Sequence, residues 1–172
     1  MSSKLTICNM ALISLGLEVY TNINDIEILK DIYNQVLENE LIRGGFYFSI
    51  KEADLLKDIK DDSKFVMPVD FLSLVDSSYK GDYIKDGADR FFIPYCKIAD
   101  MSIKYIARID EEDFPIFFAE LLSASLAREA AYSLTKDTNM IQYANSLYIQ
   151  KVANARNSEP HQKGYFYKDN NF

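Results

Sequence analysis

The 172-residue chain contains no tryptophan, one histidine, two cysteines and four prolines. Cys8 and Cys96 do not form a Cys-x-x-Cys pair, and with His161 they fall short of the four ligands of a structural zinc site. Cys8 falls on the apolar stripe of an expected helix. We therefore expect two reduced core thiols and no metal or other cofactor, with a disulfide or a metal role for the cysteines as the less favoured alternative.

Long hydrophobic runs are also missing, because the apolar stretches are interrupted within a few residues. No segment is therefore long enough to span a bilayer. The N-terminus, Met1 to Lys4, leads into a patterned helix and not into an apolar signal region. We expect a protein that is made and folds in a cytoplasm and does not contact a membrane.

Sequence motifs of catalysis are scarce. Gly44-Gly45 lacks the Lys-Ser/Thr that would follow it in a phosphate-binding loop. His161 has no recognisable partners for a Ser-His-Asp set. We expect no enzymatic activity. Carboxylate-dependent hydrolysis stays open as an alternative, and it would need a close carboxylate pair in a concave pocket.

Basic residues are fewer than acidic residues, which gives the chain a net charge of −7. Residues 1–144 contain 15 basic and 24 acidic side chains, whereas residues 145–172 contain 4 basic and 2 acidic side chains. An acidic body binds phosphates poorly, although it suits the wall of a passage through which DNA slides. Solubility explains the same charge equally well.

The chain is long enough for one domain with its own core, and 48% of its residues are hydrophobic. Apolar residues recur at three- and four-residue steps, which predicts helices over residues 3–15, 25–43, 114–136 and 139–155. Gly16 and Gly44-Gly45 are expected to end the first two helices. Asn24 with Glu27 resembles a capping box, and Asp137 or Thr138 is expected to cap the last helix.

A two-residue alternation dominates residues 46–109 and predicts a β-rich insert. A short strand or extended arm is expected at residues 46–50, and strands are expected at residues 71–75, 82–85, 90–95 and 101–109. A turn is expected at Asp86-Gly87, and an exposed loop or helical turn over 51–64. The fold class is therefore α+β. We expect a single domain, residues 1–156, in which a bundle of about four helices packs with a small antiparallel sheet inserted between the second and third long helices.

Four consecutive acids, Asp110, Glu111, Glu112 and Asp113, precede Phe114-Pro115. Such a cluster can suggest a metal site, but the further ligands and the glycine turn of a calcium or magnesium loop are absent. We expect this acidic loop to cap the helix that starts at residue 114 and to complement its dipole.

Residues 157–172 form a C-terminal aromatic tail or arm that is too short to build a core. Its aromatic residues either fold back on the same chain or dock on a neighbouring subunit or partner. The candidate interface residues are Tyr165, Phe166, Tyr167 and Phe172, together with Lys151 and Arg156.

Seven short motifs follow one another in a specific order between residues 3 and 135. They are ICNMALISLG (7–16), TNIND (21–25), YNQVLENEL (33–41), FYFS (46–49), MPVDFL (67–72), KYIARI (104–109) and FPIFFAELL (114–122). In this order they resemble the tail tubular protein A, or head–tail connector adaptor, family of short-tailed bacteriophages, which includes ring proteins of crAss-like gut phages. Tyr47 stands where that family usually has tryptophan, and no clear match follows Leu134.

The resemblance implies a structural virion protein without catalytic residues. It implies a ring of twelve copies at the head–tail junction, in contact with the portal protein and with downstream tail or ring proteins. DNA would pass through the lumen without sequence-specific binding. The alternative from another class is a non-virion helical adaptor or regulatory protein, which would form a small oligomer and would not bind a portal.

Overall fold

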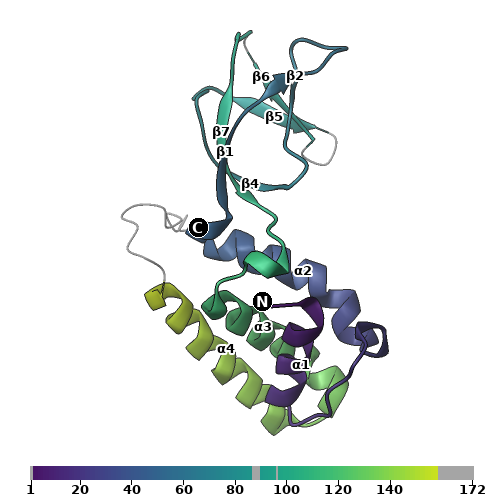
Figure 1. Ribbon diagram of the computed structural model, residues 1–172. Coiled ribbons are helices and arrows are strands. Elements are labelled where there is room, and N and C mark those ends of the chain that lie inside the picture. Colours follow the sequence, from purple (N-terminus) through teal and green to yellow (C-terminus); the bar gives the residue numbers. More distant parts are fainter. Residues whose placement is uncertain (1, 87–89, 96, 159–172) are drawn as a thin grey trace. The chain divides into compact units, whose positions relative to one another are not determined.

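The computed structural model describes residues 2–86, 90–95 and 97–158. Within these ranges the fold is mixed α+β, with four helices and two small antiparallel sheets (Figure 1). The predicted class is therefore confirmed, but the single predicted sheet is wrong, because three strands form one sheet and four form another. The chain divides into two compact units, residues 1–43 with 109–172 and residues 44–108, called here the helical unit and the β unit. That residues 1–156 act as one domain stays a prediction.

The four predicted helices are present, and each end lies within three residues of the expected one. They are α1 (Lys4–Ser14), α2 (Glu27–Gly44), α3 (Ile116–Thr135) and α4 (Thr138–Ser158). Helix α3 packs against both α1 and α4. Residues 121–127 of α3 are all buried, so this helix is the centre of the helical unit. Its alanines and serines allow neighbouring helices to approach on several sides.

Several helix ends follow the sequence signals. Gly16 and Gly45 adopt positive φ angles of 69° and 56°, the left-handed conformation that glycine accepts without steric cost. Asp137 Oδ1 accepts a hydrogen bond from the backbone N–H of Asn139 at 2.8 Å, which caps α4. Cys8 is a free, buried thiol, and burial raises its pKa to about 11. Cys96 lies outside the described residues.

Two cap predictions are wrong. Asn24 does not cap α2, because Asn22 closes a short 3-10 turn over Ile23–Asp25 and the Asn24 side chain accepts from Lys30 Nζ at 2.8 Å. The acidic residues do not cap α3 either, because Glu111–Asp113 form their own 3-10 turn and Phe114 and Pro115 then stay extended. A residue before proline avoids the helical region, so the helix begins one turn after the acids.

The β unit contains seven short strands within its described residues. They are β1 (Ile50–Asp54), β2 (Leu56–Lys57), β3 (Phe65–Val66), β4 (Phe71–Ser77), β5 (Tyr83–Asp86), β6 (Phe91–Pro94) and β7 (Ser102–Ala107). The strand orders are β1-β7-β4 and β2-β3-β6-β5, with antiparallel pairing throughout. The predicted strands at residues 71–75, 82–85, 90–95 and 101–109 are confirmed. The turn at Asp86-Gly87 involves residues outside the described ranges.

Two other predictions in this unit are wrong. Residues 47–49 form a 3-10 turn in place of the expected strand, because Ser49 Oγ donates to the carbonyl of Phe46 at 2.7 Å and closes it. Residues 51–64 are not simply a loop, since they include β1 and β2. Strand β1 is an edge strand, so its polar residues Lys51 and Glu52 remain exposed while the backbone pairs with β7.

Candidate functional site

The sequence-predicted interface residues fall into two groups. Lys151 lies on α4, where its Nζ forms an ion pair with Glu120 Oε2 of α3 at 2.7 Å. Arg156 is exposed in the last turn of α4. Tyr165, Phe166, Tyr167 and Phe172 lie outside the described residues. The structure therefore brings Lys151 into the packing between two helices, and the interface role of the whole set stays a prediction.

A buried carboxylate is the feature of the helical unit that the sequence analysis missed. Glu40 of α2 is only 3% exposed. Ser125 Oγ of α3 donates a hydrogen bond to Glu40 Oε1 at 2.8 Å. Tyr148 of α4 donates from its hydroxyl to Oε1 at 3.1 Å. One carboxylate thus joins three helices.

Arginines complete this cluster. Arg43 donates to the Tyr148 hydroxyl, and its Nη1 lies 3.9 Å from Glu40 Oε1. The Arg128 guanidinium lies 3.9 Å from the centre of the Tyr148 ring, a cation–π arrangement. Burial and the charge of Glu40 raise the pKa of Tyr148, although the two arginines oppose the shift. The phenol therefore stays protonated and keeps its hydrogen bond to Glu40. We call Glu40, Arg43, Ser125, Arg128 and Tyr148 the polar clamp.

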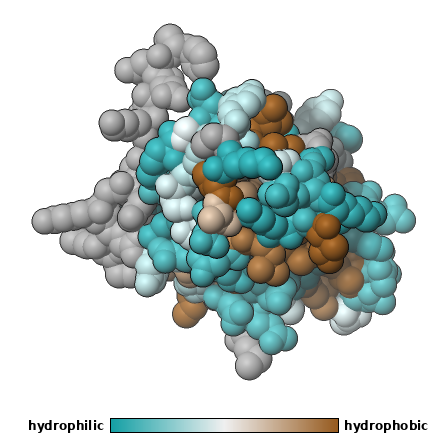
Figure 2. Space-filling model, turned by 90° about the horizontal axis from the view of Figure 1, so that it is seen from above, coloured by the Kyte–Doolittle hydropathy of each residue, from teal (hydrophilic) through white to brown (hydrophobic). Residues whose placement is uncertain are grey.

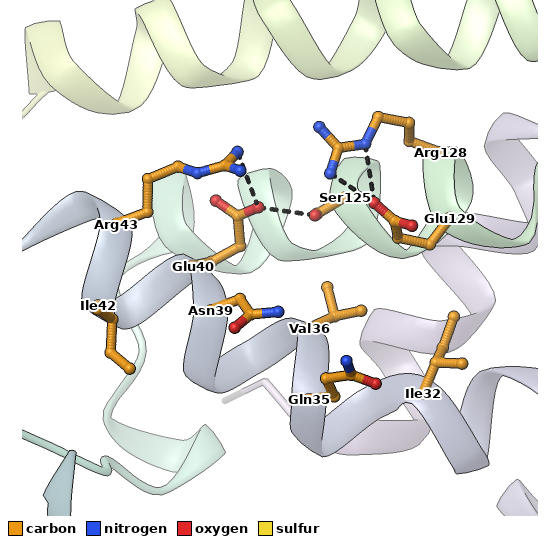
Figure 3. Close-up of a pocket in the computed structure, with 10 residues that line it drawn as sticks. All are labelled: Ile32, Gln35, Val36, Asn39, Glu40, Ile42, Arg43, Ser125, Arg128 and Glu129. Carbon is orange, nitrogen blue, oxygen red and sulfur yellow. Dashed lines mark hydrogen bonds and ion pairs between the residues drawn. The ribbon is translucent and has the colours of Figure 1, made fainter. Parts of the chain in front are cut away.

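A groove of about 510 Å³ opens beside the polar clamp, between α2 and α3 (Figure 3). It is lined by Ile32, Gln35, Val36, Asn39, Glu40, Ile42, Arg43, Ser125, Arg128 and Glu129. Its two carboxylates are both engaged, since Glu129 Oε1 accepts two hydrogen bonds from Arg128 at 2.6 and 3.2 Å. A carboxylate that is held by hydroxyl and guanidinium donors favours helix packing over acid–base chemistry.

The position of Glu40 could have been noticed in the sequence. Tyr33, Leu37 and Leu41 define the buried stripe of α2, and residue 40 lies on the same side at helical spacing. A charged residue at such a position needs partners once it is buried. The sequence does not show that Ser125 and Tyr148, which lie more than eighty positions further along the chain, are these partners.

Asp70 holds together one sheet of the β unit. Its Oδ2 lies 2.7 Å from Lys51 Nζ of β1, and its Oδ1 accepts from the Tyr105 hydroxyl of β7 at 3.0 Å. Burial alone would raise the pKa of Asp70, but the hydrogen bonds from Lys51 and Tyr105 outweigh it and hold the pKa below its usual range. Burial and the same carboxylate raise the pKa of Tyr105 to about 12.

Large hydrophobic side chains are exposed on both units, and Figure 2 shows such hydrophobic residues interrupting a hydrophilic surface. On the helical unit they include Ile13, Ile116, Tyr132, Tyr143 and Ile149. On the β unit they include Leu56, Ile59, Val66, Val69, Ile84 and Tyr95. Single exposed apolar side chains are ordinary on a protein surface, whereas a contiguous patch of them marks a contact surface.

In the part of the chain that the structure describes, no three His, Cys, Asp or Glu side chains are grouped so that they could hold a metal ion. Among the described helices, none has the length and apolar character needed to cross a bilayer.

No protein-family model matches the chain, and no curated protein matches it.

Proposed function

We propose that this chain is a structural subunit of the head–tail connector of a short-tailed bacteriophage. In this proposal twelve copies form a ring between the portal protein and the tail at the head–tail junction of the virion. The ordered motifs between residues 3 and 135 support this family, and the exposed hydrophobic side chains on both compact units support assembly. The exposure of these hydrophobic side chains is the structural observation on which the proposal depends.

A closed ring needs two different surfaces on each subunit, because copies related by rotation meet head to tail. A connector needs further surfaces for the rings above and below it. A chain with apolar side chains exposed on one unit alone would suit a simple pair. Exposure on both the helical unit and the β unit suits a subunit with several neighbours.

The proposed architecture is a helical adaptor domain with the β unit as an insertion between α2 and α3. The polar clamp would hold α2, α3 and α4 in one arrangement, which a repeated subunit requires. The helical unit contains 9 basic and 15 acidic residues over residues 1–43 and 109–172. Such a surface would let DNA pass through the lumen without being bound.

Two alternatives make different predictions. A carboxylate-dependent enzyme would need a free acid–base pair, whereas both carboxylates of the groove accept hydrogen bonds from Ser125, Tyr148 or Arg128. A non-virion adaptor or regulatory protein would form a small oligomer and would not bind a portal protein.

The direct experiment mixes the purified full-length chain with the portal protein encoded in the same genome. Electron microscopy of the mixture is expected to show a second ring coaxial with the portal. Particles of portal alone at every salt concentration would contradict the proposal, because a connector subunit must recognise the portal surface.

A further inference from the structure

The four-stranded sheet of the β unit has an unusual outer face. Val66 pairs with both Leu56 and Phe91, and Ile84 pairs with Ile93. Directly paired residues of antiparallel strands share one face, and residues two apart on a strand share it too. Leu56, Val66, Ile84, Phe91 and Ile93 therefore lie on the same side of the sheet, called here the outer apolar face.

The opposite side of this sheet is its packed side. Phe65 pairs with Phe92, and both are fully buried. The ring of Tyr83 stacks on Phe92 with 4.1 Å between the ring centres. An antiparallel sheet with one packed face normally presents polar residues on the other.

The outer apolar face departs from that rule. Leu56 is 77% exposed, Val66 42% and Ile84 47%, and Phe91 and Ile93 are half-buried. Asp86 pairs with Phe91 and so belongs to the same side, which makes five of its six strand residues apolar. Such a face is expected to be covered by a partner.

We infer that the outer apolar face binds residues 159–172 of a second copy of this chain. The inference rests on the proposed ring, in which each subunit must offer two different surfaces. Residues 159–172 follow α4 of the helical unit in the sequence, whereas the face belongs to the β unit. A contact of the segment with the face joins two different surfaces, as the interfaces of a ring do.

The chemistry of the two partners is complementary. The segment places Tyr165, Phe166 and Tyr167 together and adds Phe172, and such aromatic side chains bury well on an apolar sheet. Lys163 and Lys168 flank the aromatic cluster. The loop between β2 and β3, at the edge of the face, contains three aspartates and two lysines, a net charge of −1: Asp58, Lys60, Asp61, Asp62 and Lys64.

The length of the segment also fits a neighbouring subunit. Residues 159–172 are fourteen in number. Fully extended, fourteen residues span up to about 50 Å, at roughly 3.3–3.6 Å for each residue. That reach exceeds the width of a small domain, so the segment can leave its own chain and lie on the next one.

The test uses photocrosslinking in the full chain. Phe166 is replaced by the photoreactive residue benzoylphenylalanine, and equal amounts of ¹⁴N- and ¹⁵N-labelled protein are mixed before irradiation, with and without the portal protein. We expect crosslinks from residue 166 to peptides that contain Leu56, Val66, Ile84 or Phe91. Half of these crosslinked pairs should join one light and one heavy chain.

A pair of variants gives the matched control. Leu56→Thr with Ile84→Thr removes two exposed apolar side chains from the face and is expected to lower the yield of mixed crosslinks about tenfold. Val69→Thr makes the same kind of change at an exposed residue outside the four-stranded sheet, and it should leave the yield unchanged. Circular dichroism of the three proteins checks that each is folded.

Three results would overturn the inference: crosslinks that join only chains of the same isotope, crosslinks to the helical unit, or equal loss in both variants. The outcome is separable from that of the proposed function. A coaxial ring without mixed crosslinks would refute the docking and leave the connector proposal standing. Mixed crosslinks without portal binding would support the docking and refute the connector proposal.

Discussion

The two compact units differ in where they place charged side chains. The helical unit contains a carboxylate at its core, and it satisfies Glu40 with partners from three helices. The β unit contains 10 basic and 11 acidic residues over 44–108, yet it leaves a row of apolar side chains on the outside of one sheet. The helical unit buries this charged group, and both units leave apolar side chains exposed. The difference therefore lies in the interior, where the polar clamp joins α2, α3 and α4 of the helical unit.

The largest expected effect lies in the core of the helical unit. Leu126 of α3 is fully buried, so Leu126→Ala should lower the free energy of unfolding by about 3 kcal/mol through lost burial and a residual cavity. Ile149→Ala on α4, where the side chain is exposed, should change it by less than about 0.5 kcal/mol. Urea denaturation followed by circular dichroism measures both. Equal effects would mean that α3 is not the centre of this unit.

The polar clamp should contribute less than the apolar core but more than any surface pair. Tyr148→Phe removes the donor to Glu40 and the acceptor of Arg43, and it should cost about 2 kcal/mol because a buried carboxylate loses a partner. Tyr143→Phe is the matched control, since Tyr143 is exposed on the same helix. A cost no larger than that of the control would show that the clamp does not stabilise the fold.

The ion pair of the β unit is expected to contribute about 1 kcal/mol, because Lys51 and Asp70 are partly solvated. The pKa of Asp70 is lowered from 3.8, so its stabilisation is present at neutral pH and is lost as the pH falls below 3.8 through the pKa of the folded state. In Asp70→Asn the stability at neutral pH should fall and its loss in this acid window should shrink. Thermal melts of both proteins between pH 7 and pH 2 test this, and parallel curves would contradict it.

The smallest effect on stability should come from the C-terminal segment. A chain that ends at Ser158 keeps α4 complete, so its melting should stay cooperative and its midpoint nearly unchanged. Assembly should nevertheless weaken, because the aromatic residues of 159–172 are gone. Calorimetry measures the first and sedimentation velocity the second. Loss of cooperative melting would mean that the segment belongs to the core of its own chain.

The sequence predicts the helices well because their buried faces repeat at helical spacing, and burial of residues such as Leu122 and Leu126 confirms that period. It fails at β1, where Lys51 and Glu52 belong to an exposed edge strand and leave no alternating apolar signal. It also fails at the start of α3, where Pro115 delays the helix. In each case a local pattern is overridden by pairing or by backbone sterics.

The candidate sites are harder to predict because their parts come together only in the fold. Glu40 and Tyr148 both lie on helical stripes, but the hydrogen bond between them depends on how α2 and α4 pack. The outer apolar face depends on the register that places Leu56, Val66 and Phe91 in one row. A sequence pattern gives the faces of single elements and does not give the register between distant strands.

Native mass spectrometry of the full-length chain with its portal protein tests the central proposal most directly, because it counts the subunits. We expect a single complex that contains twelve copies of this chain bound to one portal ring. A spectrum with the portal ring and this chain as separate species, at every protein and salt concentration, would contradict it.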